Sequence, residues 1–370
     1  MKVIKNVILF LLCIGVISCL LVFSKQVSAS VQNSLSLCMN TIIPSLFCFM
    51  AVCSVIASSR LSSIFFLPFK RFVAFLYGVN RDEVPLVVLS IIGGYPTGAK
   101  LIADRVKSGE LSRPNANRLL FFCVNSGPAF LISGISVPIF GNTVVGWVLF
   151  ISHILSGIII ANITRTKRIS HIARKKRPCY QSLPLSIITS AQTTASAMAV
   201  ICALVIMFAA FVVLLNASGI TDFISSLLRP LIPKEFTLAL ISGGLEICGG
   251  IGNIKSLVGS GIILASALTA FGGICVHTQI FAIAKKANLS LNQFFFYRIA
   301  HTFFSTLITL ALIKVIPIPQ TVGIILGENT STGNGTLLSS IFLVLICGLL
   351  LLNLHKSDII SKVRFIAKKE

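Results

Sequence analysis

An apolar stretch at positions 86–100, LVVLSIIGGYPTGAK, is broken halfway along by three glycines and a proline. A bilayer offers no water to exposed backbone N–H and C=O groups, so irregular backbone at membrane depth survives only where protein covers it or a cavity is lined by it. A second stretch of this kind, LALISGGLEICGGIGN, lies at 238–253. The fold must therefore accommodate two interrupted apolar segments.

The composition identifies an integral membrane protein. Of 370 residues, 55% are hydrophobic and 11% are charged, whereas soluble domains carry about 25% charged residues. Eleven cysteines are scattered without a C-x-x-C pair, which is typical of small buried side chains and of neither a disulfide framework nor a metal site. The net charge of +21 is explained by basic cytoplasmic loops. We therefore expect no nucleic-acid partner, no metal and no cofactor.

The charges beside the first broken stretch predict its topology. Arg81 precedes it, and Lys100, Arg105 and Lys107 follow it. Because basic flanks stay in the cytoplasm, both ends lie on one side and the segment is not a single crossing. Its first arm, as a helix of about ten residues, rises about 15 Å, half of the ~30 Å hydrocarbon core. We expect a re-entrant hairpin whose tip, GGYPTG, reaches the bilayer midplane.

Eight further apolar segments are long enough to cross the membrane. They are 6–23, 35–57, 119–139, 143–163, 193–215, 259–284, 291–316 and 337–354. The first is followed by the run VSAS and is either a cleaved signal peptide or an uncleaved anchor; we favour the anchor. Two segments interrupted by charges, 62–79 and 222–233, are expected to lie in the membrane interface. The basic loop at 165–177 and the basic tail place the loop and both termini of this multi-pass protein in the cytoplasm.

The same order of elements occurs twice: a crossing, an interfacial helix, a broken hairpin and two crossings. The copies start from opposite faces, which predicts an all-α polytopic membrane protein of about eight transmembrane helices plus two re-entrant broken hairpins arranged as an inverted repeat. The predicted units are an N-terminal transmembrane helix (1–34), a first repeat (35–163), a basic linker (164–192), a second repeat (193–316), and an outer loop with the last helix and tail (317–370). Alternatively, the glycines are packing notches between close helices.

Candidate substrate-binding residues lie at the two tips and in the crossings that follow them. They are Gly93, Gly94, Tyr95, Pro96, Thr97 and Gly98 in the first tip, Glu246, Gly249 and Gly250 in the second, and Asn125, Ser126, His277, Thr278 and Gln279 in the crossings. Inverted-repeat transporters bind solutes near the midplane with helix ends and unwound carbonyls. Alternatively, the tip residues only shape the turns, the polar residues join helices, and His277 is a core histidine.

Glu246 is the only acid that this topology places at membrane depth. Burying an isolated carboxylate is costly unless it is neutral or paired. Two roles remain open for it, coupling to a cation or proton, and a structural ion pair with Lys100 or Lys255.

Four motifs carry a resemblance to a known family. GGYPTGAK, SGELSRPNANRLL, NSGPAF and GGLEICGG resemble the sporulation integral membrane protein YlbJ family, within the nucleoside transporter and FeoB Gate (nucleoside recognition) domain group. The resemblance covers roughly 35–316 and implies a gate-like fold and a role in spore maturation. Relatives often have E-I-T-x-G where this chain has Cys248, so the threonine hydroxyl is lost here. The GTPase motif G-x-x-x-x-G-K-S/T is absent, which excludes an iron-transport GTPase for this chain alone.

Two functions fit these features. The first is a secondary transporter or permease for a small polar solute such as a nucleoside. The second is a non-transporting membrane protein that assembles or anchors a partner in sporulation through the basic loop. We expect no enzyme, because H-E-x-x-H, G-x-S-x-G and a carboxylate pair are all missing. Small residues at 256–270 pack a helix either within the subunit or between subunits of a homo-oligomer.

Overall fold

The computed structural model describes residues 2–165, 180–230, 232–252, 254 and 260–318. Within these ranges the chain is helical, with no strand beyond one isolated bridge between Ser59 and Gln181. Six helical runs there are long and apolar enough to cross a membrane. The prediction of an all-α polytopic membrane protein is therefore confirmed.

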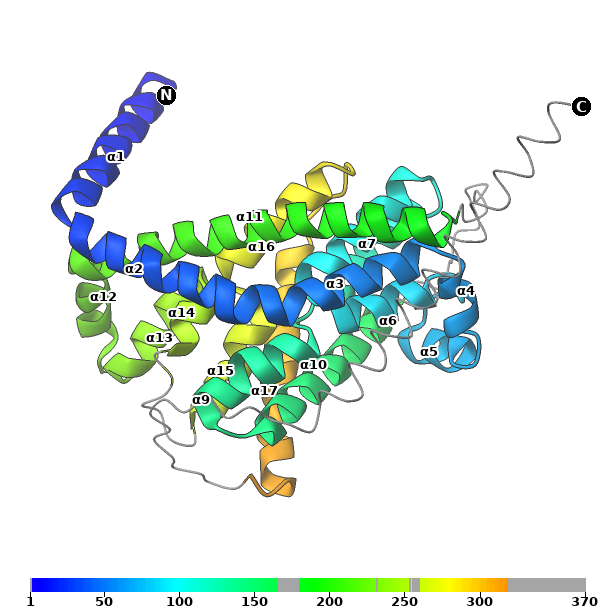
Figure 1. The fold of residues 1–370 in the computed structure, drawn as a ribbon. Coiled ribbons are helices and arrows are strands. Elements are labelled where there is room, and N and C mark those ends of the chain that lie inside the picture. The colour runs from blue at the N-terminus through cyan, green and yellow to red at the C-terminus, as the bar shows by residue number, and fades with distance from the viewer. Residues whose placement is uncertain (1, 166–179, 231, 253, 255–259, 319–370) are drawn as a thin grey trace, which may run out of the picture.

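The longest elements are two helical runs of 35 residues that lie antiparallel along one side of the body (Figure 1). One comprises α2 (Ser24–Leu37), η1 (Cys38–Ile42) and α3 (Ile43–Ser58), and the other is α11 (Leu183–Ala217). At 1.5 Å per residue each is about 50 Å long, well beyond the ~30 Å hydrocarbon core. Both therefore extend past the crossings expected at 35–57 and 193–215. The side chains buried with this pair include Cys38, Ile42, Met50, Met198, Ile201 and Val205.

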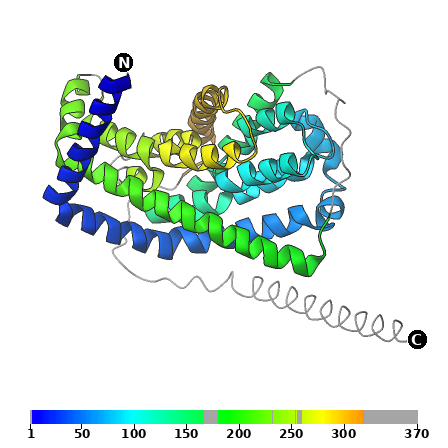
Figure 2. The same ribbon diagram turned by 90° about the horizontal axis from the view of Figure 1, so that it is seen from above.

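The first helix, α1 (Lys2–Val22), projects away from this body in Figure 1, and the view from above places it at the end where α2 begins and α11 ends (Figure 2). None of its most apolar window is buried against the rest of the chain. Large apolar side chains are also exposed on other helices, among them Phe211 on α11 and Phe303 further along the chain. Such faces match a lipid environment and not water, so the bilayer contact that the composition predicted is supported.

The first half continues with short and interrupted helices. In order they are α4 (Leu61–Phe65), α5 (Lys70–Tyr77), α6 (Val84–Gly93), α7 (Tyr95–Lys107), α8 (Arg113–Cys123), η2 (Phe130–Ser136), α9 (Val137–Phe140) and α10 (Thr143–Ile163). The interfacial helix expected at 62–79 is thus two helices. Pro68 restricts the residue before it and separates them by a turn.

The second half follows a similar order after α11. Its elements are α12 (Ile220–Leu228), α13 (Lys234–Leu245), α14 (Ile247–Gly252), α15 (Ser260–Phe271), α16 (Gly273–Lys285) and α17 (Phe294–Val315). The predicted crossing at 337–354, the polar outer loop, the basic tail and all of the basic loop except Arg165 fall outside the described residues.

Two wide π-helical turns have a local cause in the sequence. η1 comes directly before the helix turn that contains Pro44, and η2 directly before the one that contains Pro138. Proline lacks an N–H and clashes with the carbonyl one turn earlier, and an extra residue in that turn relieves the clash.

Two segments that we predicted as crossings contain a break in the helix. In 119–139, α8 ends at Cys123, residues 124–127 are not helical, and the helix resumes beyond Pro128. In 259–284, α15 ends at Phe271, and Gly272 and Gly273 take left-handed φ angles of 94° and 65°. A proline after Gly127 and a glycine pair both disfavour continued helix. The run Ser260–Lys285 is still long and apolar enough to cross a membrane, whereas the apolar helix beyond the first break, Phe130–Phe140, is shorter.

The middle of the body is formed by α10 and α17, which pack along each other (Figure 1). The rings of His153 on α10 and His301 on α17 meet edge to face at 5.4 Å between centroids. The broken segments pack on this pair, α8 and η2 from the first half and α15 from the second.

Candidate functional site

The first broken stretch forms a tight helical hairpin. α6 ends at Gly93, Gly94 takes φ +81° and ψ −173°, and α7 begins at Tyr95. A Cβ atom on Gly98 would lie 3.1 Å from the Ser90 side chain and would collide with the carbonyl of Cys123. In a continuous helix, residues eight apart are separated by about 12 Å along the axis. The chain therefore reverses at Gly94, as a re-entrant segment requires.

Two candidate residues of this tip, Thr97 and Pro96, stabilise the turn between α6 and α7. The Thr97 hydroxyl donates to the Gly93 carbonyl at 2.8 Å, and Pro96 lies in the first turn of α7, where its missing N–H costs no hydrogen bond. Gly94 also touches the first break, because a Cβ on it would lie 3.1 Å from the Gly127 nitrogen. The tip of the first hairpin thus packs on the broken segment that follows it.

The second broken stretch also reverses, at Glu246 between α13 and α14. Gly243 and Gly250 pack so closely that a Cβ on Gly250 would overlap the Gly243 backbone. The Glu246 side chain is buried, with its residue 3% exposed. Its Oε1 accepts a hydrogen bond from the Cys248 nitrogen at 2.9 Å, and its Oε2 accepts one from the Gly249 nitrogen at 2.7 Å. The carboxylate therefore caps the first turn of α14.

The predicted ion pair between Lys100 and Glu246 is not the arrangement found. Lys100 Nζ lies 3.4 Å from Asp104 Oδ2 on the same helix. Lys255, the other candidate partner, falls outside the described residues. Within the part of the chain that the structure describes, backbone amides satisfy Glu246.

A hydroxyl network joins the first tip to the other half. The Ser126 hydroxyl, in the first break, donates to the Tyr95 hydroxyl at 2.6 Å. The Tyr95 hydroxyl in turn donates to the backbone carbonyl of Thr269, in the last turn of α15. All three residues are buried. The candidate residues Tyr95 and Ser126 are therefore brought together, around an acceptor that sequence analysis did not find.

The two tips contact the same break. A Cβ on Gly272 would lie 3.5 Å from the Tyr95 ring, and one on the adjacent Gly273 would lie 3.0 Å from the Gly243 carbonyl. The break between α15 and α16 is therefore next to the first tip on one side and the second hairpin on the other.

Arg298 is the central residue that sequence analysis missed. It lies on α17, is 1% exposed, and its guanidinium donates to the carbonyls of Val124 and Ala270 and, at 3.4 Å, to Asn125 Oδ1. Asn125 in turn donates to the Phe122 carbonyl at 2.7 Å. The helix around it is one of the candidate spans, so this arginine does not lie in a basic flanking loop. A cation within the apolar stretch 291–316 was the available signal.

Two histidines were also missed. His153 Nε2 lies 3.2 Å from Thr269 Oγ1, and the Ser156 hydroxyl donates to the His301 carbonyl at 2.9 Å. Both imidazoles are fully buried. His153 and His301 are single histidines in two separate apolar segments, and no sequence pattern indicates that they lie side by side.

The candidate residues on α16 are dispersed. The His277 ring lies among Phe271, Phe294 and Phe295, with centroids 4.8–5.7 Å away. Thr278 donates to the Ile274 carbonyl of its own helix at 2.9 Å, and Gln279 Nε2 contacts Cys275 Sγ at 3.6 Å. Among the described residues, the hydrogen bonds and ring contacts of these three side chains go to these partners and not to Tyr95, Ser126 or Thr269.

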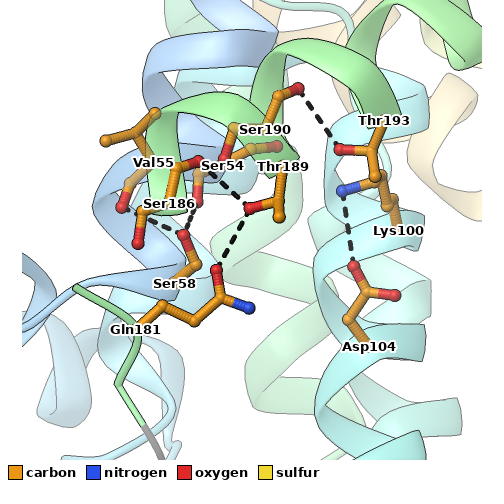
Figure 3. Close-up of polar contacts among 10 residues, drawn as sticks. All are labelled: Ser54, Val55, Ser58, Lys100, Asp104, Gln181, Ser186, Thr189, Ser190 and Thr193. Atoms are coloured by element: carbon orange, nitrogen blue, oxygen red, sulfur yellow. Dashed lines mark hydrogen bonds and ion pairs between the residues drawn. The ribbon is translucent and has the colours of Figure 1, made fainter. Parts of the chain in front are cut away.

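A polar groove lies between α3, α7 and α11 (Figure 3). Its volume is about 290 Å³, and its lining includes Ser54, Ser58, Lys100, Asp104, Gln181, Thr189, Ser190 and Thr193. Thr189 donates to Gln181 Oε1 at 3.1 Å, and Thr193 donates to the Ser190 carbonyl at 3.2 Å. The hydroxyls of Ser186 and Thr194 on the same helix are buried without a partner among the described residues. The groove follows α7, the helix whose opposite end carries Tyr95.

Helical hairpins packed against interrupted helices, with six helical runs long and apolar enough to cross a membrane among the described residues, define a polytopic all-α membrane protein. The chain is 24% identical over 316 residues to the sporulation integral membrane protein YlbJ of Bacillus subtilis (strain 168), covering 76% of each chain. This similarity confirms the resemblance to YlbJ, and the assignment to the Gate domain group stays a prediction. No family model and no solved structure matches the chain.

Proposed function

We propose that this protein is a secondary transporter or permease for a small polar, nucleoside-like solute. The observation that carries the proposal is the hydroxyl network of Tyr95, Ser126 and the Thr269 carbonyl, which joins a hairpin tip to the broken helix of the other half. Such junctions of half-helices expose backbone donors and acceptors at membrane depth, where inverted-repeat transporters bind their solutes.

The chemistry of this junction suits a solute with hydroxyls and a flat ring. Tyr95 supplies an aromatic face, and the hydroxyls and carbonyl around it offer donors and acceptors. These groups bond to one another in the present arrangement, so an entering solute replaces protein hydrogen bonds with its own. The first hairpin then moves away from α15, which opens the junction.

The groove between α3, α7 and α11 supports a route to this junction. It is lined by hydroxyl and charged side chains and follows the second arm of the first hairpin. Lys100, Arg105 and Lys107 on that arm favour a cytoplasmic position for its outer end. On this basis we propose that the groove is the cytoplasmic vestibule.

Matched positions support the inverted repeat. The half-helices α8 and α15 end at Cys123 and Phe271, and the paired histidines of α10 and α17 are His153 and His301. Cys123 and Phe271 are as far apart in the sequence as His153 and His301 are. Each half also reverses once, at Gly94 and at Glu246, before its broken helix.

We further propose a role in sporulation, which the name of the Bacillus subtilis relative supports. The alternative function is a membrane protein that anchors or assembles a partner through the basic loop at 165–177, without transport. Transport requires the buried junction around Tyr95 to bind a solute, whereas anchoring through the basic loop does not.

Reconstitution into liposomes and uptake of a nucleoside panel test the proposal. We expect the wild type to take up at least one nucleoside of the panel and Asn125→Ala to lose this uptake. The substitution removes one hydrogen-bond partner from Arg298 and one from the Phe122 carbonyl. Thr306→Ala is the matched control, because its hydroxyl bonds only to the Thr302 carbonyl of its own helix. If no solute moves, and Asn125→Ala and Glu246→Gln still support sporulation, the transporter proposal is rejected and the anchoring function is favoured.

A further inference from the structure

Arg298 is a buried cation with no acidic partner among the residues that the structure describes. It is 1% exposed, and the ion pairs found there join other residues. Burying an uncompensated charge in a protein interior is costly. Something other than a carboxylate must therefore balance the guanidinium.

The balance comes from two helix ends. Val124 directly follows the last residue of α8, and Ala270 is in the last turn of α15, and the carbonyls of both accept hydrogen bonds from the guanidinium. The C-terminus of a helix carries a partial charge of about −0.5, so two such ends sum to about −1. This matches the single positive charge of Arg298.

Two further groups lie beside the guanidinium, whose Nε is buried without a hydrogen-bond partner among the described residues. Asn125 Oδ1 accepts from Arg298 Nη1 at 3.4 Å, and the guanidinium carbon lies 5.8 Å from the centre of the Tyr95 ring. A cation near an aromatic ring is stabilised by the ring quadrupole. Two carbonyls, an amide oxygen and an aromatic ring thus form a cage that is selective for positive charge.

In secondary transporters, unwound carbonyls and half-helix C-termini are the groups that coordinate a coupling cation such as Na⁺. We propose that this cage is a monovalent-cation site that the chain fills permanently with the Arg298 guanidinium, so that no alkali cation binds there. The planar fork of arginine reaches both carbonyls at once, whereas the point charge of lysine reaches one. The inference concerns ion occupancy and holds whether or not the protein transports a solute.

The experiment measures the midpoint of thermal unfolding, Tm, of the full chain in lipid nanodiscs. Chloride salts of choline, Na⁺, K⁺ and guanidinium are compared. Guanidinium is kept at low millimolar concentration, and the total ionic strength is the same in all four solutions. For the wild type we expect one Tm in all four salts. For Arg298→Ala in choline we expect Tm to fall by about 5 °C or more, because two helix ends lose their counter-charge. Guanidinium should recover at least half of that loss in a saturable way.

Two variants separate this role from a general effect of charge. Arg113→Ala removes an exposed arginine at the start of α8 and should show neither the loss nor the recovery. Arg298→Lys keeps the charge and should have a Tm between the wild type and Arg298→Ala, without a response to guanidinium. It also serves as the folded variant if Arg298→Ala does not assemble.

Three results would overturn the proposal. They are a saturable rise of the wild-type Tm with Na⁺ or K⁺, a Tm of Arg298→Lys equal to that of the wild type, and an Arg298→Ala protein whose Tm does not respond to guanidinium. Because the readout is stability, failure of this proposal leaves the uptake experiment unaffected.

Discussion

The hydroxyl of Tyr95 donates a hydrogen bond to the backbone carbonyl of Thr269, which lies 174 positions away in the other half of the chain. Thr269 also places its own hydroxyl 3.2 Å from His153 Nε2 on α10. One turn of α15 therefore contacts the tip of the first hairpin and the central helix pair. A movement of that hairpin relative to α15 breaks the Tyr95 bond, which couples the two halves.

Tyr95→Phe removes only the hydroxyl from this junction. We expect the free energy of unfolding to fall by about 1–3 kcal/mol, because the Ser126 hydroxyl and the Thr269 carbonyl stay buried and lose a partner. Thermal unfolding in nanodiscs measures the change. Tyr297→Phe is the control, since that ring stacks on Phe121 at 4.3 Å and is less buried. Equal effects of the two substitutions would contradict the coupling role of Tyr95.

Gly250→Ala should disrupt the second hairpin. The new Cβ would overlap the backbone of Gly243, and overpacking of this kind costs about 1–3 kcal/mol or more. Gly244→Ala on the same hairpin has nothing within 4 Å of the new atom and should leave stability unchanged or slightly improved. The yield of folded protein and its Tm are the measurements. A Gly250→Ala protein as stable as Gly244→Ala would show that the hairpin arms do not pack in this way.

Glu246 can be tested by separating its hydrogen bonds from its charge. Glu246→Ala leaves the amides of Cys248 and Gly249 without a side-chain acceptor and should cost about 1–2 kcal/mol. Glu246→Gln keeps one acceptor oxygen, so its Tm should lie closer to the wild type. If Glu246 couples transport to a proton or cation, the glutamine variant folds but loses coupled uptake. If Glu246→Gln shows full uptake, the role of Glu246 is limited to capping α14.

The proposed inverted topology places the two hairpins on opposite faces. Ser108, just beyond α7, should lie on the cytoplasmic side, and Ser226 on α12 on the outer side; both are exposed. Cysteines introduced at these positions, with the exposed Cys13 and Cys48 changed to serine, should react with a membrane-impermeant thiol reagent from opposite faces. Labelling of both positions from one face would rule out the inverted arrangement.

Some of this architecture was predictable because its causes are local. The reversal at Gly94 follows from GGYPTG and from basic residues at both ends, since glycine conformation and flanking charge act within a few residues. The break near Pro128 and the one at Gly272 had equally local signals. We predicted crossings there from length and apolar character, which do not show where a helix is interrupted.

The surroundings of Arg298 had no such signal. In the sequence it is one arginine in an apolar stretch, and its acceptors Val124 and Ala270 are 174 and 28 positions away. Hydrophobicity, flanking charge and helix breakers in the sequence alone determined a membrane protein with two chain reversals. Only the tertiary structure decided that two broken helix ends meet one guanidinium, because a counter-charge made of backbone dipoles exists only once those helices have been brought together.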